Sequence, residues 1–93
     1  MAKPANIDFQ DFLKAVRILA VRRGFLLNEE RKKGSGIRFE LFKNKNDTKP
    51  HGMWVVHEDL KEKKIYSDDL KKACKELGVT KEDFESLIKN KFK

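Results

Sequence analysis

Residues 31–43 read RKKGSGIRFELFK, and this stretch contains a turn followed by the strand around which we place the other elements. From Ile37 to Leu41, apolar and polar residues alternate. Alternation with a period of two is typical of a strand that buries one face. We therefore predict a strand over 36–44 that begins at a glycine turn, residues 34–36. Glycine suits such a turn because it adopts positive φ without a steric penalty.

The remaining elements follow from apolar periodicity and from turn residues. A helical apolar stripe precedes Gly24, with Asn6 or Asp8 available as its N-cap. In chain order we expect a frayed tail over 1–6, a helix over 8–23, and strands over 25–30, 36–44 and 53–56. A charged connector over 58–66 follows. Two helices complete the chain: one is capped by Ser67 and ends at Gly78, and the other runs from a Thr80 capping box to about Asn90. This order predicts one α+β domain over residues 1–93, a two-layer α-β-β-β-α unit with a short extra C-terminal helix.

The chain carries 22 basic and 15 acidic side chains, a formal net charge of +7, which favours an anionic partner. Most of the excess lies between 31 and 49, where seven basic residues outnumber two acidic ones. Cationic side chains there can contact phosphates, while turn amides and a serine hydroxyl add neutral donors. The residues expected to bind nucleic acid are Arg31, Lys32, Lys33, Gly34, Ser35, Gly36 and Arg38. An ordinary hairpin with a solvated basic face is the alternative interpretation.

Composition argues against several other classes of protein. Cys74 is the single cysteine, so no intrachain disulfide forms and we expect a reducing compartment. The chain has no signal-peptide core and no apolar run of membrane-spanning length, so we predict a cytoplasmic protein. His51, His57 and Cys74 show no recognised metal-ligand spacing, and no dinucleotide or P-loop glycine pattern occurs. We therefore expect neither a metal nor a cofactor, and Cys74 is expected to be a small core residue.

Aromatic and histidine side chains bear on a nucleic-acid function. Trp54 and Phe42 could stack on bases, although a strand tryptophan in so small a domain also serves as core. Metal-free cleavage of RNA needs a general acid or base beside the scissile phosphate, and histidine is the natural choice. His57 ends the third predicted strand and is the candidate catalytic residue; a hydrogen-bonded structural histidine is the alternative. We expect His51, in a Pro-His-Gly turn, to be solvated.

With these residues in view, the chain resembles the HicA toxin family, small mRNA-cleaving proteins with a fold like that of the double-stranded RNA-binding domain. The likeness extends from about Phe9 to Ile88. Two motifs match family patterns: Lys33-Gly34-Ser35 lies where the family has a K-G-S-H turn, and Val55-Val56-His57 lies where it often has V-P-x-H. Further matches are Gly24-Phe25 after the first helix, Leu60, Ser67-Asp68-Asp69-Leu70, Leu77-Gly78-Val79-Thr80 and Asp83-Phe84.

The chain departs from the family pattern at the catalytic histidine, because that position is Gly36 here and the next residue is Ile37. The resemblance implies a metal-independent mRNA endoribonuclease of a toxin–antitoxin pair. With the histidine replaced, three alternatives stay open. Either His57 or a repositioned His51 acts instead, or the chain binds RNA without cutting it, or its basic hairpin docks an acidic protein. The resemblance also implies a HicB-like antitoxin partner that is acidic where it covers residues 31–38.

Overall fold

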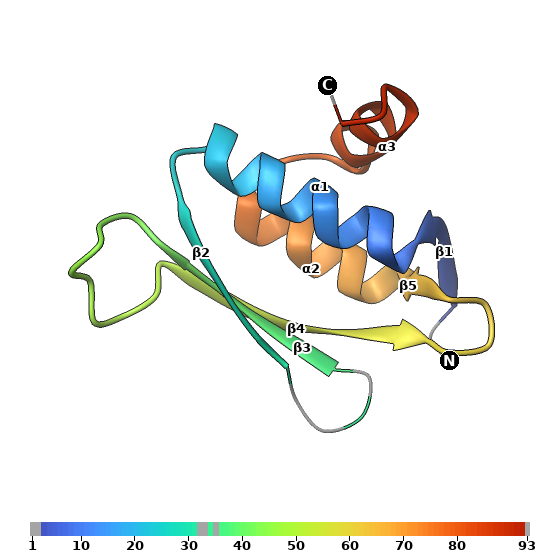
Figure 1. Cartoon of the computed structure of the whole chain (residues 1–93), viewed down its shortest axis with the longest axis horizontal. Helices are drawn as coiled ribbons and strands as arrows, with labels where there is room; N and C mark the ends of the chain where they lie inside the picture. Colours follow the sequence, from blue (N-terminus) through green and yellow to red (C-terminus); the bar gives the residue numbers. More distant parts are fainter. Residues whose placement is uncertain (1–2, 32–33, 35, 93) are drawn as a thin grey trace.

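The computed structural model describes residues 3–31, 34 and 36–92. Within these residues, antiparallel strands form a five-stranded sheet in the spatial order β1-β5-β4-β3-β2 (Figure 1). The strands are β1 (Pro4–Asp8), β2 (Leu26–Arg31), β3 (Gly36–Phe42), β4 (Gly52–Asp59) and β5 (Lys64–Tyr66). The three predicted strands are therefore confirmed as β2, β3 and β4.

The helices are α1 (Phe9–Arg22), α2 (Ser67–Leu77) and α3 (Lys81–Lys89). In Figure 1, α1 and α2 lie side by side along one face of the sheet, and α3 lies beyond α1. The result is a two-layer α+β fold. Its elements α1, β2, β3, β4 and α2 follow the order of the double-stranded RNA-binding domain, with β1 added before α1, β5 inserted between β4 and α2, and α3 added at the end. The predicted fold class is confirmed.

Local capping chemistry sets most of the helix ends as predicted. Asp8 caps α1, because its Oδ1 accepts the backbone N–H groups of Gln10 and Asp11 at 2.9 and 3.4 Å. At the end of α2, Gly78 adopts the left-handed conformation with φ of 71°. A Thr80 capping box begins α3 with both of its hydrogen bonds present.

The start of α2 differs from the prediction. Tyr66 is the N-cap residue and makes no side-chain capping bond, while Ser67 is already helical. The backbone N–H of Ser67 donates instead to the carbonyl of Lys3 at 2.8 Å. The prediction that Ser67 caps this helix is therefore wrong, because β5 runs directly into α2 and the N-terminal segment satisfies the exposed amide.

Stacked aromatic rings form the centre of the core. The ring of Phe12, which is fully buried, stacks on Phe84 at a centroid distance of 5.4 Å and meets Phe39 edge-on at 6.4 Å. Phe39 in turn stacks on Trp54 at 5.1 Å. Trp54 is only 5% exposed, so it cannot stack on bases as one prediction had it, and its alternative role as core is confirmed. These contacts join the sheet to α1 and α3.

Residues 4–8 form a strand, so the frayed tail predicted over 1–6 is wrong from Pro4 onward; residues 1–2 lie outside the described part of the chain. β1 pairs with β5, with Pro4 opposite Tyr66. Ala5 and Ile7 point into the core and are 6% and 5% exposed, while the alternate residues Pro4, Asn6 and Asp8 are exposed. Pro4 is tolerated because it begins the strand, where a missing N–H removes no bond from the centre of the sheet. The tail prediction failed because two buried residues give too short a pattern to recognise.

The predicted charged connector over 58–66 also contains strand structure. β4 continues to Asp59, the chain turns through 60–63, and it returns as β5. Lys63 adopts a positive φ of 59° in this turn. The side chain of Ile65 is fully buried. A single apolar residue among charged ones carries no detectable period, which is why the sequence pattern indicated a connector.

Candidate nucleic-acid interface

The pairing of β3 with β4 places His57 beside the glycine turn. His57 is directly opposite Gly36 in the antiparallel register, and the Cα atoms of opposed residues lie about 4.5–5.5 Å apart. Arg38 lies two residues along β3 and therefore on the same face as Gly36, as a diagonal neighbour of the histidine. The His57 side chain is 55% exposed. Three predicted site residues from two separate segments thus form one surface.

Asp69, which the sequence did not single out as functional, connects α2 to this end of β4. Its side chain is 11% exposed, and its Oδ2 accepts the backbone N–H of His57 at 2.9 Å. The same oxygen lies 3.9 Å from His57 Nδ1, and Oδ1 lies 3.8 Å from Nζ of Lys72. Both separations exceed hydrogen-bond length and act as electrostatic contacts. The carboxylate also lies in the first turn of α2, where the helix dipole favours negative charge.

This arrangement contains groups that can transfer a proton. Asp69 faces the Nδ1 side of the imidazole, so the Nε2 side is directed away from this carboxylate. An imidazole in this position can accept a proton from a substrate hydroxyl. Lys72, with its side chain 62% exposed, adds a cation beside the same carboxylate.

The basic hairpin does not gather its two arginines on one surface. Arg31 lies opposite Ile37, whose side chain is buried in the core, whereas Arg38 lies opposite Glu30. Side chains alternate between the faces of a sheet along each strand. Arg31 and Arg38 therefore lie on opposite faces, and the expectation that both contact one phosphate surface is wrong.

Arg38 is also held within the hairpin. Its Nη2 donates to Oε2 of Glu30 in an ion pair, and its Nε is buried without a partner among the described residues. A guanidinium carries five N–H donors, so the ion pair leaves others for a ligand. Gly34 has the positive φ, 81°, expected of the turn. Three predicted binding residues lie outside the part of the chain that the structure describes, namely Lys32, Lys33 and Ser35.

His51 does not join this surface. The next residue, Gly52, is opposite Leu41 at the far end of the β3–β4 ladder. At about 3.3 Å per residue, six residues of extended chain separate His51 from His57 by about 20 Å. The idea that a repositioned His51 replaces the family's histidine at the turn is therefore wrong. Its ring lies instead against Phe25, with a centroid separation of 5.1 Å.

Cys74 lacks the environment of a reactive thiol. It is partly buried against the core. Burial raises the pKa of the Cys74 thiol, and the negative charges of Asp83 and Glu82 raise this pKa further. Because the thiolate is the nucleophilic form, this cysteine is suited to packing and not to covalent chemistry.

The described residues contain no group of three or more His, Cys, Asp or Glu side chains that could hold a metal ion. No helix within 3–31, 34 and 36–92 is long and apolar enough to cross a bilayer. Comparisons with protein-family models, with curated proteins and with solved structures found no match. The case for a function therefore depends on the geometry of the chain itself.

Proposed function

We propose that this chain is an RNA-binding domain of the HicA-like type, which contacts the RNA backbone at the sheet end formed by the glycine turn, the end of β4 and the start of α2. The observation that carries the proposal is the pairing of Gly36 with His57, with Arg38 on the same face. Gly36, a guanidinium and an imidazole then lie on one face of the sheet, and backbone amides and cationic side chains are groups that contact phosphates. The net charge of +7 supports a polyanionic ligand.

Binding is tested by fluorescence anisotropy with labelled single-stranded and duplex RNA across a range of salt concentrations. Each neutralised phosphate adds about −0.7 to −0.9 to the slope of log affinity against log salt. We expect Arg38→Gln to weaken binding severalfold and to reduce the slope by about one. Arg17→Gln is the matched control, because Arg17 also pairs with a glutamate, Glu29, but on the helix side of the sheet. Equal effects of the two substitutions, or a flat salt response, would refute the proposal.

RNA cleavage is a second candidate function, favoured by the contact between His57 and Asp69. In this reaction His57 takes the proton of a ribose 2′-hydroxyl, whose oxygen attacks the adjacent phosphorus. The P–O5′ bond breaks, leaving a 2′,3′-cyclic phosphate and a 5′-hydroxyl end that gains a proton. We expect cleavage in the presence of EDTA to be lost in His57→Ala and kept in His51→Ala. Intact RNA at high protein concentration would leave the binding function alone.

The competing proposal is a protein-interaction module whose basic hairpin docks an acidic protein, such as a HicB-like antitoxin. The two proposals differ in what the chain captures from its native host. Co-purification of an acidic protein, together with no RNA affinity at physiological salt, would replace RNA binding by protein binding.

A further inference from the structure

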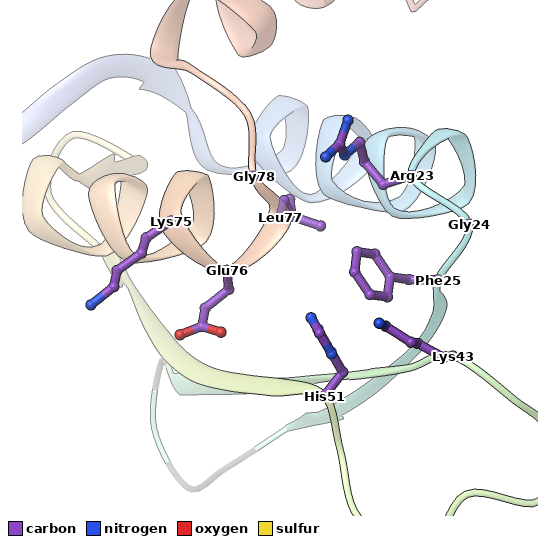
Figure 2. A pocket seen from close by; sticks show the side chains of 9 residues that line it. All are labelled: Arg23, Gly24, Phe25, Lys43, His51, Lys75, Glu76, Leu77 and Gly78. Atoms are coloured by element: carbon purple, nitrogen blue, oxygen red, sulfur yellow. The ribbon is translucent and has the colours of Figure 1, made fainter.

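A second site candidate lies at the opposite end of the β3–β4 ladder from His57. A cavity of about 460 Å³ opens between the ends of α1 and α2 and the loop after β3 (Figure 2). This volume falls within the range of small-molecule sites. The residues that matter here are Arg23, Phe25, Lys43, His51, Lys75 and Glu76.

Three cations that pair with no described residue line this cavity. Elsewhere in the described chain, Arg17 and Arg38 are paired with glutamates. By contrast, the side chains of Arg23, Lys43 and Lys75 have no hydrogen bond or ion pair to any described residue. Figure 2 shows the Lys43 amine directed toward His51, whereas the Lys75 amine points away from the other lining side chains. An unpaired positive charge beside a hollow favours an anion.

Part of this charge has a structural explanation. α1 and α2 both end at the cavity, and cations near helix C-termini stabilise the helix dipole. That explanation covers Arg23 and Lys75. It does not cover Lys43 and His51, which come from the loop between β3 and β4. The loop thus adds cationic and aromatic groups that the helices do not require.

The other lining groups suit a planar ring and its polar substituents. The rings of Phe25 and His51 lie 5.1 Å apart at a tilt of 33°, and they form an aromatic wall on one side of the cavity. The carboxylate of Glu76 occupies the space that a Cβ at Gly52 would fill, so the glycine admits this acceptor to the cavity. Aromatic side chains stack on bases of any sequence, and a carboxylate can accept a ribose hydroxyl or a base N–H.

We propose that this cavity binds a nucleotide: the phosphate at Lys43, the base against Phe25 and His51, and a hydroxyl or N–H at Glu76. The nucleotide is either free or the phosphorylated end of an RNA. Five residue steps along β3, from Gly36 to Leu41, place this site about 17 Å from the glycine turn. The proposal therefore does not depend on RNA contact at the turn.

Isothermal titration with adenosine monophosphate, adenosine and inorganic phosphate tests the proposal. We expect the nucleotide to bind more tightly than either part alone. Lys43→Gln should weaken it about tenfold, since a hydrogen bond between charged groups is lost. Phe25→Leu should weaken it too, because leucine keeps the apolar bulk without a stacking face. The matched control is Lys45→Gln, in the same loop but outside the cavity, with an effect within about twofold.

Three outcomes would overturn the proposal: no nucleotide binding at millimolar concentration, equal loss in Lys43→Gln and Lys45→Gln, or inorganic phosphate binding as tightly as the nucleotide. A pair of short RNAs, with and without a 5′-phosphate, distinguishes the two sources. Tighter binding of the phosphorylated RNA than of the free nucleotide identifies an RNA end as the ligand. The reverse order identifies the free nucleotide.

Discussion

Replacement of Asp69 by alanine should destabilise the domain far more than replacement of its neighbour Asp68. Asp69 is largely buried and accepts the backbone N–H of His57, which ties the first turn of α2 to the end of β4. Asp68 lies in the same helical turn but is exposed, and no hydrogen bond or ion pair of its side chain forms within the described residues. The two variants share the loss of a favourable charge at the helix start. Only one of them loses the bond between elements.

The magnitude follows from these contacts. A hydrogen bond to a charged acceptor contributes about 1.5–3 kcal/mol. A carboxylate at a helix N-terminus contributes about 0.3–1 kcal/mol. We therefore expect Asp69→Ala to lower the free energy of unfolding by about 2–3 kcal/mol and Asp68→Ala by less than about 1 kcal/mol. Asp69→Asn keeps an acceptor oxygen and should fall between the two.

Equilibrium unfolding in urea, followed by fluorescence of the single tryptophan, Trp54, measures these differences. That indole is buried and stacked on Phe39, so unfolding changes its surroundings. With a urea dependence of about 1–2 kcal/mol per molar, Asp69→Ala should lower the midpoint by about 1–3 M. Equal midpoints for the Asp68 and Asp69 variants would refute the inference that this carboxylate joins α2 to β4.

Two further predictions concern β1 and the single cysteine. Ile7→Ala should cost about 2–3 kcal/mol, as for a buried aliphatic side chain; a loss under about 0.5 kcal/mol, typical of an exposed site, would show that the segment is a frayed tail after all. The folded state raises the pKa of the Cys74 thiol, so the protonated thiol contributes to the free energy of unfolding. This contribution is fully present below the unfolded pKa of the thiol and is lost as pH rises through its folded pKa. A raised pKa also leaves less of the nucleophilic thiolate at a given pH. Iodoacetamide at pH 8 should alkylate Cys74 more slowly in the native than in the urea-unfolded protein, and equal rates would contradict the raised pKa.

The elements predicted correctly are those whose signals are local. The alternation from Ile37 to Leu41 and the caps at Asp8 and Thr80 depend on residues a few positions apart. β1 and β5 each bury only one or two side chains; β1 is held by its pairing with β5, and β5 by its pairing with both β1 and β4. A pairing across more than fifty residues leaves no mark on the periodicity of either segment. The tail and connector were mispredicted for this reason.

The candidate site shows the same division. His57 and the glycine turn were both recognised from residue type, but their proximity depends on the register of β3 against β4. The face of the sheet on which Arg31 and Arg38 each lie likewise depends on the register of β2 against β3. The sequence of the turn between the two strands does not determine this register. From the sequence, Asp69 is typical of the first turn of a helix, and no neighbouring residue indicates its hydrogen bond with the backbone N–H of His57.

The strand pairing at the N-terminal edge has a consequence for folding during synthesis. Pro4 pairs with Tyr66, so β1 leaves the ribosome long before the segment that completes its ladder exists. Contacts between residues so distant in sequence are slow to form. Until β5 and α2 emerge, β1 has no strand to pair with and Ala5 and Ile7 are incompletely covered. A nascent chain halted before that point would expose an unpaired apolar strand that can associate with other chains.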